Sequence, residues 1–105
     1  MSNTSRPKLL DNAQFDASMA KLRDWEEVEG EDAIRKMFKF RNFDAAFDFM
    51  TRVAKHAQKL DHHPTWINEF NRVDIVLTTH DLKGISDLDV QLAHLIDEEA
   101  ATTTK

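Results

Sequence analysis

The sequence predicts an α+β fold with the order α-β-β-α-β-β-α, a four-stranded antiparallel sheet with helices packed on one face. Three observations predict it. Apolar residues recur at helical spacing in the stretches 11–23, 43–60 and 88–96. The alternating stretches between these helices are typical of hairpins. A chain of 105 residues has the size of one domain, so residues 1–105 should form a single unit.

The first helix should begin at a capping residue. Asp11 or Asn12 can accept a hydrogen bond from the free backbone amides of a first turn. The apolar stripe that follows consists of Phe15, Met19 and Leu22. We expect residues 1–10 to be a flexible arm and residues 101–105 to be a frayed tail.

Two hairpins should supply the four strands. In the first, residues 25–29 are extended, Gly30 permits a turn, and residues 33–40 alternate in polarity. In the second, residues 66–71 precede a strand over 73–80, one face of which consists of Val73, Ile75, Leu77 and Thr79. Hairpins join neighbouring strands, so the sheet should be antiparallel.

The stretch 43–60 carries the strongest helix signal. At 100° per residue its apolar side chains cover an arc of roughly 160°, wider than the stripe of roughly 100° that one sheet contact needs. The helix is either a deep core helix or one that also packs on a partner subunit, and we favour the second. It should end near Asp61, because Pro64 disfavours a helical conformation at His63.

The last helix should begin next to Ser86. The segment from Ser86 to Asp89 resembles a capping box, with Asp89 where glutamate or glutamine is more usual. The apolar stripe of this helix consists of Leu88, Leu92, Leu95 and Ile96.

Composition excludes several classes of function. The net charge is -5 and the basic residues are scattered among acidic ones, which argues against a nucleic-acid surface. The chain has no cysteine, so disulfides, thiolate zinc sites and cysteine nucleophiles are excluded. No apolar run approaches membrane-spanning length, and the first ten residues lack the apolar region of a secretory signal. We therefore expect a cytoplasmic protein.

Three of the five histidines are candidates for function. His62 and His63 lie in the stretch DHHPTW, in a loop after a helix, and His80 lies at a strand end, where functional residues are common. His56 and His94 fall on polar helix faces, and we interpret both as solvated residues.

The histidine doublet allows three interpretations: chance exposure of polar side chains, a metal site, or proton transfer. Adjacent residues on an extended chain point to opposite sides, so His62 and His63 cannot easily bind one metal ion, and we rank metal binding below proton transfer. Histidine titrates near neutrality, which suits an acid and a base on two sides of a pocket. Asp61 or Asp89 could fix a tautomer. Trp66 either gives a planar ligand a flat wall or belongs to the core.

Residue spacing does not reveal a substrate, but a resemblance to a known family implies one. Residues 25–99 resemble the pterin-4a-carbinolamine dehydratases, also known as dimerisation cofactors of a homeodomain transcription factor. The segments that carry it are EGEDAIRKMFKFRNFDAAFDFMTRVA, KLDHHPTW, FNRVDIVLTTH and GISDLDVQLA. They combine H-H-P-x-W after a helix, a strand ending T-H and a helix opening S-x-x-D, and this combination is highly specific.

The resemblance implies a dehydratase. Its substrate would be a 4a-hydroxytetrahydropterin (4a-hydroxytetrahydrobiopterin), the product left by aromatic amino acid hydroxylases. Removal of water would give quinonoid dihydropterin, which a reductase recycles. The leaving hydroxyl gains a proton and the neighbouring ring N–H loses one, and neither a metal nor another cofactor is implied.

The resemblance also assigns site residues. The expected catalytic residues are His62, His63 and His80, with His63 and His80 as the proton-transfer pair and His62 chiefly positioning the ring. The segment 78–81 would hold the pyrimidine-like edge of the pterin. The expected substrate-binding residues are Asp61, His62, His63, Pro64, Trp66, Thr78, Thr79, His80, Asp81 and Asp89.

Two residues depart from the pattern of animal relatives. Gln58 stands where they have glutamate, which removes a negative charge near the pocket. Leu88 stands where they have arginine, which removes a positive charge beside Asp89. Neither belongs to the H-H-P core, and we interpret both as surface drift.

Finally, the resemblance implies assembly. A homodimer or homotetramer would form through the helix 43–60 and the sheet edge, which agrees with the wide apolar arc. The same helix would hold the dimerisation helix of a transcription factor. An alternative function is therefore an oligomeric binding module that acts as a dimerisation cofactor and coactivator, which would add the nucleus to the expected locations. We expect no direct contact with nucleic acid or membrane.

Overall fold

The computed structural model describes residues 7–103 and confirms the expected α+β order. The helices are α1 (Asn12–Lys21), α2 (Phe43–Leu60) and α3 (Asp87–Thr102). The strands are β1 (Glu26–Val28), β2 (Ala33–Lys39), β3 (Thr65–Glu69) and β4 (Arg72–Leu77), and a 3-10 turn, η1 (His80–Leu82), follows β4. Within this described part of the chain, no helix is both long and apolar enough to cross a membrane.

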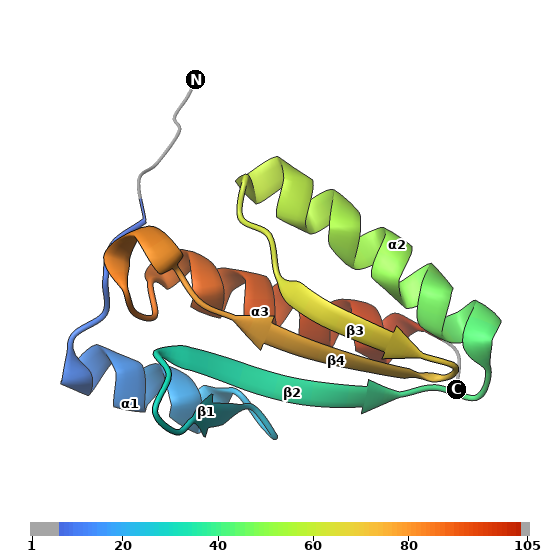
Figure 1. Cartoon of the computed structure of the whole chain (residues 1–105), viewed down its shortest axis with the longest axis horizontal. Helices are drawn as coiled ribbons and strands as arrows, with labels where there is room; N and C mark the ends of the chain where they lie inside the picture. The colour runs from blue at the N-terminus through green and yellow to red at the C-terminus, as the bar shows by residue number, and fades with distance from the viewer. Residues whose placement is uncertain (1–6, 104–105) are drawn as a thin grey trace.

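The four strands form one antiparallel sheet in the order β1-β2-β4-β3. The expected hairpins are both present, and the central pair, β2 with β4, joins them. Gly30 lies in the turn between β1 and β2 with φ of 80°, a left-handed conformation that glycine adopts without a Cβ clash. Strand β3 lies at one edge of the sheet and β1 at the other (Figure 1).

One face of the sheet carries the core. Val73, Ile75 and Leu77 of β4 are fully buried, as the alternation predicted. The helices cover them with residues at helical spacing, among them Phe49 and Val53 of α2 and Leu92 and Ile96 of α3. Figure 1 shows α3 running behind the strands. On the open face Ile67 is 69 % exposed, so the helices protect one side of the sheet only.

A cross-strand ion pair lies on the sheet. Arg35 of β2 donates two hydrogen bonds to Asp74 of β4, at 2.8 Å and 2.6 Å. These hydrogen bonds, and then the negative charge of Asp74, raise the pKa of Arg35 above its ordinary value. The pair is exposed, so it adds little to stability and instead favours one pairing register of the two strands.

Helix α2 divides its wide apolar arc between two environments. Four residues of the arc are buried: Ala46, Phe49, Val53 and Ala57. In contrast, Phe43 is 45 % exposed and Phe47 is 53 % exposed, with their ring centroids 5.8 Å apart. Burial within this chain therefore accounts for one side of the arc and leaves an aromatic pair uncovered on the other.

The amino-terminal segment differs from the expected flexible arm of residues 1–10. Leu9 forms a β-bridge with Ser86, and the N–H of Leu10 donates to the carbonyl of Ile85 at 3.0 Å. These bonds hold the segment against the chain that leads into α3. Residues 1–6 lie outside the described part of the chain.

The carboxyl-terminal end also differs from the expected frayed tail of residues 101–105. Helix α3 continues through Thr102, and Thr103 is buried and donates its hydroxyl to the carbonyl of Glu99 at 2.7 Å. Tertiary burial holds this end, and composition alone does not reveal it. Residues 104–105 are not described.

Strand β4 is shorter than the expected strand over 73–80 and ends at Leu77. His80 therefore does not end a strand. It opens η1, in which the N–H of Leu82 bonds to the carbonyl of Thr79 at 3.0 Å. Thr79 nevertheless keeps the inward direction of the alternation and forms a β-bridge with Gly84, so the chain turns sharply immediately after it.

The core predicts the effect of one truncation. Phe49 is fully buried between Phe38 and Phe40, whose ring centroids lie 5.1 Å and 4.8 Å away. Phe49→Ala should lower the free energy of unfolding by roughly 3–5 kcal/mol, measured by urea denaturation. Phe70→Ala is the matched control, because Phe70 is 65 % exposed, and it should change that free energy by less than about 0.5 kcal/mol. Equal losses in the two variants would contradict this placement of the core.

Candidate active site

The end of α2 aims the histidine doublet. Asp61 caps the helix with φ of 53°, and its N–H bonds to the carbonyls of Ala57 and Gln58. Few residues other than glycine adopt this left-handed conformation, and aspartate is one of those that do. The chain therefore reverses at Asp61, and His62 and His63 follow without secondary structure. Their rings contact different partners, as the extended geometry predicted.

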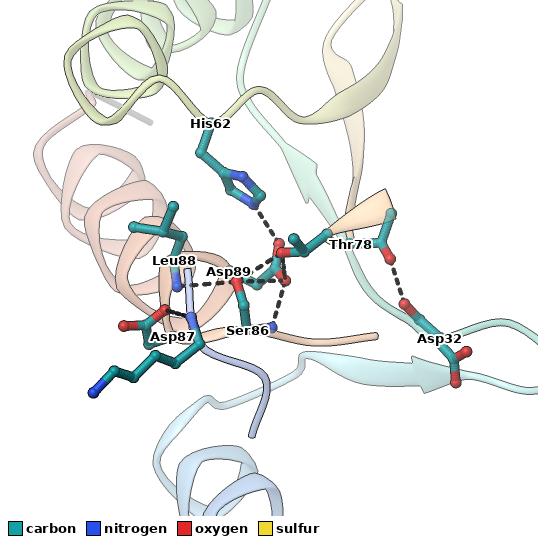
Figure 2. A network of polar contacts seen from close by, with 9 residues as sticks. Asp32, His62, Thr78, Ser86, Asp87, Leu88 and Asp89 are labelled. Atoms are coloured by element: carbon teal, nitrogen blue, oxygen red, sulfur yellow. Dashed lines mark hydrogen bonds and ion pairs between the residues drawn. The ribbon is translucent and has the colours of Figure 1, made fainter. Parts of the chain in front are cut away.

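His62 is held by a buried carboxylate. Its Nε2 lies 2.5 Å from Oδ1 of Asp89, in the first turn of α3. Figure 2 shows the His62 ring pointing from the loop toward Asp89. The side chain of Asp89 is fully buried and that of His62 is 11 % exposed. Of the two carboxylates that could fix a histidine tautomer, the structure places Asp89, not Asp61, beside the ring.

Asp89 is satisfied by donors from two elements. The hydroxyl of Thr79 donates to its Oδ2 at 2.7 Å, and the N–H of Ser86 donates to the same oxygen at 2.8 Å. The Ser86 bond is half of the expected capping box, with Asp89 in place of the usual glutamate. A buried carboxylate is costly unless it is hydrogen-bonded, so these donors make its position possible.

A pocket of about 810 Å³ collects most of the expected site residues. Its walls are the segment 59–63, which contains the last two residues of α2, the segment 78–81 after β4, residues of α3, and Pro7. The expected residues that line it are Asp61, His62, His63, Thr78, Thr79, His80 and Asp81. Ligand pockets are typically about 300–1,000 Å³, so a small heterocycle fits this volume.

Three residues that we expected to bind a substrate do not line this pocket: Pro64, Trp66 and Asp89. Trp66 is half-buried in β3 and packs against the core, which decides between its two interpretations. Asp89 reaches the pocket only through His62. Pro64 lies in the loop that leads into β3, where it ends any continuation of the helix.

Comparison with known proteins adds an independent finding. Residues 8–99 match the family described as Pterin 4 alpha carbinolamine dehydratase. The chain belongs to this family. A solved structure of a transcriptional coactivator/pterin dehydratase from Brucella melitensis is similar to it, with 40 % sequence identity and a TM-score of 0.85. That similarity covers 89 % of this chain and 99 % of the Brucella chain, so the resemblance is confirmed, and the family implies dehydratase activity.

One departure from the pattern of animal dehydratases lies beside the pocket. Oε1 of Gln58 is 3.1 Å from Nε2 of His63. Gln58 is exposed and does not line the pocket, but it contacts a candidate proton-transfer residue. Our interpretation of Gln58 as surface drift stays a prediction. Leu88, the second departure, lines the pocket. For both residues, neighbours in space give surroundings that the sequence alone does not show.

Sequence reasoning also missed several residues that line this pocket. They are Pro7, Lys59, Leu60, Leu88 and Gln91. One signal could have found two of them, since Leu88 and Gln91 are three residues apart on a helix that starts at the expected capping box. No comparable signal points to Pro7, because its position depends on the pairing of the amino-terminal segment with the start of α3.

The two threonines of the segment 78–81 use their hydroxyls within the protein. Thr78 donates to the backbone carbonyl of Asp32, and Thr79 donates to Asp89. The exposed side chains of this segment are those of His80 and Asp81. The expectation that the backbone and side chains of residues 78–81 hold a ligand edge stays a prediction.

The remaining histidines lie outside the pocket. His94 is exposed on α3, as expected. His56 is not simply solvated, because its Nε2 lies 2.8 Å from Oε2 of Glu99 and so links α2 to α3. Within residues 7–103 no group of three or more histidine, aspartate or glutamate side chains is arranged to hold a metal ion.

The Asp89 network predicts a loss of stability. Asp89→Ala leaves the buried Thr79 hydroxyl and Ser86 N–H without their acceptor, and each such donor costs roughly 1–3 kcal/mol. Urea denaturation should show this loss. Asp16→Ala, an exposed residue of α1, is the control and should stay within about 0.5 kcal/mol of the wild type. If the two variants were equally stable, the network would not bear on folding.

Proposed function

We propose that this chain removes water from a 4a-hydroxytetrahydropterin by histidine general acid/base catalysis. One observation carries the proposal. His62, His63 and His80 come from two distant segments and line a single pocket, in a member of a dehydratase family. Imidazole can give and take protons at neutral pH, which is what this elimination requires.

The proposed reaction moves two protons. One is given to the hydroxyl on the ring-fusion carbon, and the C–O bond breaks as water leaves. The neighbouring ring N–H loses the other, and its electron pair forms the new C=N bond of the quinonoid product. One proton is consumed and one is released, so a pair of imidazoles completes the cycle without a net change of charge.

The surroundings of the three histidines support a division of roles. The ring of His62 is fixed by buried Asp89, which suits a residue that positions a ligand. His63 and His80 are exposed and can exchange protons with water after each turnover. We assign the proton transfers to these two. We assign Asp81, whose exposed carboxylate lines the pocket, to accept hydrogen bonds from the N–H groups of the pyrimidine-like edge.

Removing either proton-transfer histidine should slow the reaction. His63→Ala and His80→Ala should each lower the rate of carbinolamine dehydration by roughly 10²–10⁴-fold, the usual effect of losing a general acid or base. Stopped-flow measurement with and without protein separates the catalysed from the spontaneous reaction. His94→Ala is the matched control, because His94 is exposed on α3 outside the pocket. Wild-type rates in both pocket variants would exclude this mechanism.

The exposed aromatic pair of α2, Phe43 and Phe47, favours a second function, which is assembly with a protein partner. We propose that Phe43 and Phe47 are covered in a homodimer or homotetramer, or by the dimerisation helix of a transcription factor. The similar Brucella protein carries the name coactivator as well as dehydratase. The edge strand β3 offers a further contact between subunits. The two functions are compatible because the pocket and the aromatic pair use different residues.

A charged substitution in the aromatic pair tests this assembly. Phe47→Glu should shift the sedimentation coefficient from that of an oligomer toward that of a monomer, because a carboxylate would have to be buried without a partner. Lys55→Glu, on the exposed polar side of the same helix, is the control and should leave the oligomer intact. A wild-type protein that sediments as a monomer would contradict the proposal.

A further inference from the structure

Two hydroxyl groups, one from Thr79 in the pocket wall and one from Ser86 behind it, form a continuous hydrogen-bond chain with Asp89. The oxygen atoms of Thr79 and Ser86 are 2.6 Å apart, and the Thr79 hydroxyl lies 2.7 Å from Oδ2 of Asp89. Ser86 is fully buried and Thr79 is 6 % exposed. Contacts this short between buried polar atoms are hydrogen bonds, so in each of them one atom must donate a proton and the other must accept it.

The direction of this chain follows from the number of protons. A hydroxyl has one proton to donate and a carboxylate oxygen only accepts, so the Thr79 proton goes to Asp89. Thr79 must then accept in its contact with Ser86, and Ser86 is the donor. The alternative, donation from Ser86 to Asp89, would span 3.5 Å. Ser86 in turn accepts from the N–H of Leu88 at 3.2 Å. All hydrogen bonds of this chain therefore point the same way: Leu88 donates to Ser86, Ser86 donates to Thr79, and Thr79 donates to Asp89.

We propose that Thr79 and Ser86 are positioning residues, whose one-way hydrogen-bond chain holds Asp89 as a hydrogen-bond acceptor and so fixes His62 in the tautomer with its proton on Nε2. With Oδ2 occupied by donors, Oδ1 is turned to the His62 ring at 2.5 Å. Nδ1 is then the hydrogen-bond acceptor that His62 offers to a ligand in the pocket. Only the expected effect on dehydration kinetics rests on the proposed function, and the tautomer of His62 does not depend on it.

The fold holds both hydroxyls where the chain requires them. Thr79 faces inward because it continues the alternation of β4, and its N–H bonds to the carbonyl of Gly84 at 2.9 Å. Ser86 is fixed as the N-cap of α3, and the pairing of Leu9 with Ser86 covers it. Ser86 does not line the pocket, so it cannot touch a ligand. Its hydroxyl is joined to the pocket through Thr79, Asp89 and His62, and through the N–H of Leu88 at the start of α3.

The tautomer of His62 can be measured by NMR in the ligand-free protein. Long-range ¹H–¹⁵N correlation spectra at mildly alkaline pH should show neutral His62 with its proton on Nε2. In Thr79→Val and in Ser86→Ala, the share of the Nδ1–H tautomer should rise, because Oδ1 is no longer held against the ring. A wild-type ring with its proton on Nδ1 or on both nitrogens would overturn the proposal. Unchanged spectra in both variants would do the same.

The kinetic test uses hydroxyl deletions with matched controls. Thr79→Val and Ser86→Ala should each lower kcat/KM for the carbinolamine by roughly 2–10-fold, the effect of one lost hydrogen bond, and Thr79→Ser should restore it. Their double variant should lose about as much as the larger single effect, because both act through one chain. A loss confined to Thr79→Val would instead show that Thr79 contacts the substrate directly, and losses that multiply would show two separate contacts.

Two controls separate this effect from a general loss of stability. Thr103→Val removes a buried hydroxyl at the other end of α3, and Asn42→Ala removes the N-cap of α2. Both should leave the tautomer and kcat/KM unchanged. A wild type without dehydratase activity, but with the Nε2–H tautomer and its loss in the two variants, would refute the proposed function and leave the role of the hydroxyl chain standing.

Discussion

The contact on which the site depends is the hydrogen bond between His62 and the buried carboxylate of Asp89. It joins the loop after α2 to the first turn of α3, two segments that the chain places far apart. A carboxylate can be buried here only because Thr79 and Ser86 supply donors to its other oxygen. The pocket wall, the end of β4 and the start of α3 are therefore fixed by one set of hydrogen bonds.

The rest of the fold keeps these segments in register. The pairing of β3 with β4 sets Thr65 opposite Val76, so the end of β4 lies beside the chain that leaves α2. The buried rings around Phe49 hold α2 in place. The left-handed cap at Asp61 then sends the chain back over α3. Stability and the proposed chemistry share Asp89, whereas the exposed aromatic pair of α2 contributes to neither within one chain. We therefore attribute that pair to assembly.

Much of the fold could be predicted because hydrophobic periodicity, turn residues and helix caps are local properties of the sequence. The apolar arc of residues 43–60, the turn at Gly30 and the capping box from Ser86 to Asp89 were each visible in the sequence, and each is present. The expectations that failed concern residues whose state depends on distant neighbours. The segment containing Leu9 is paired with the start of α3, and Thr103 is buried. Neither contact has a local signature.

The sequence by itself determined the order of the elements, the inward alternation of β4 and the three candidate histidines, because these follow from periodicity and side-chain chemistry. Only the tertiary structure decided which carboxylate forms a hydrogen bond with which histidine ring. It placed Asp89 beside His62 and Gln58 beside His63, and it packed half-buried Trp66 against the core. The physical reason is that hydrogen bonds and burial are properties of pairs. Pairs between distant segments exist only after the chain has packed.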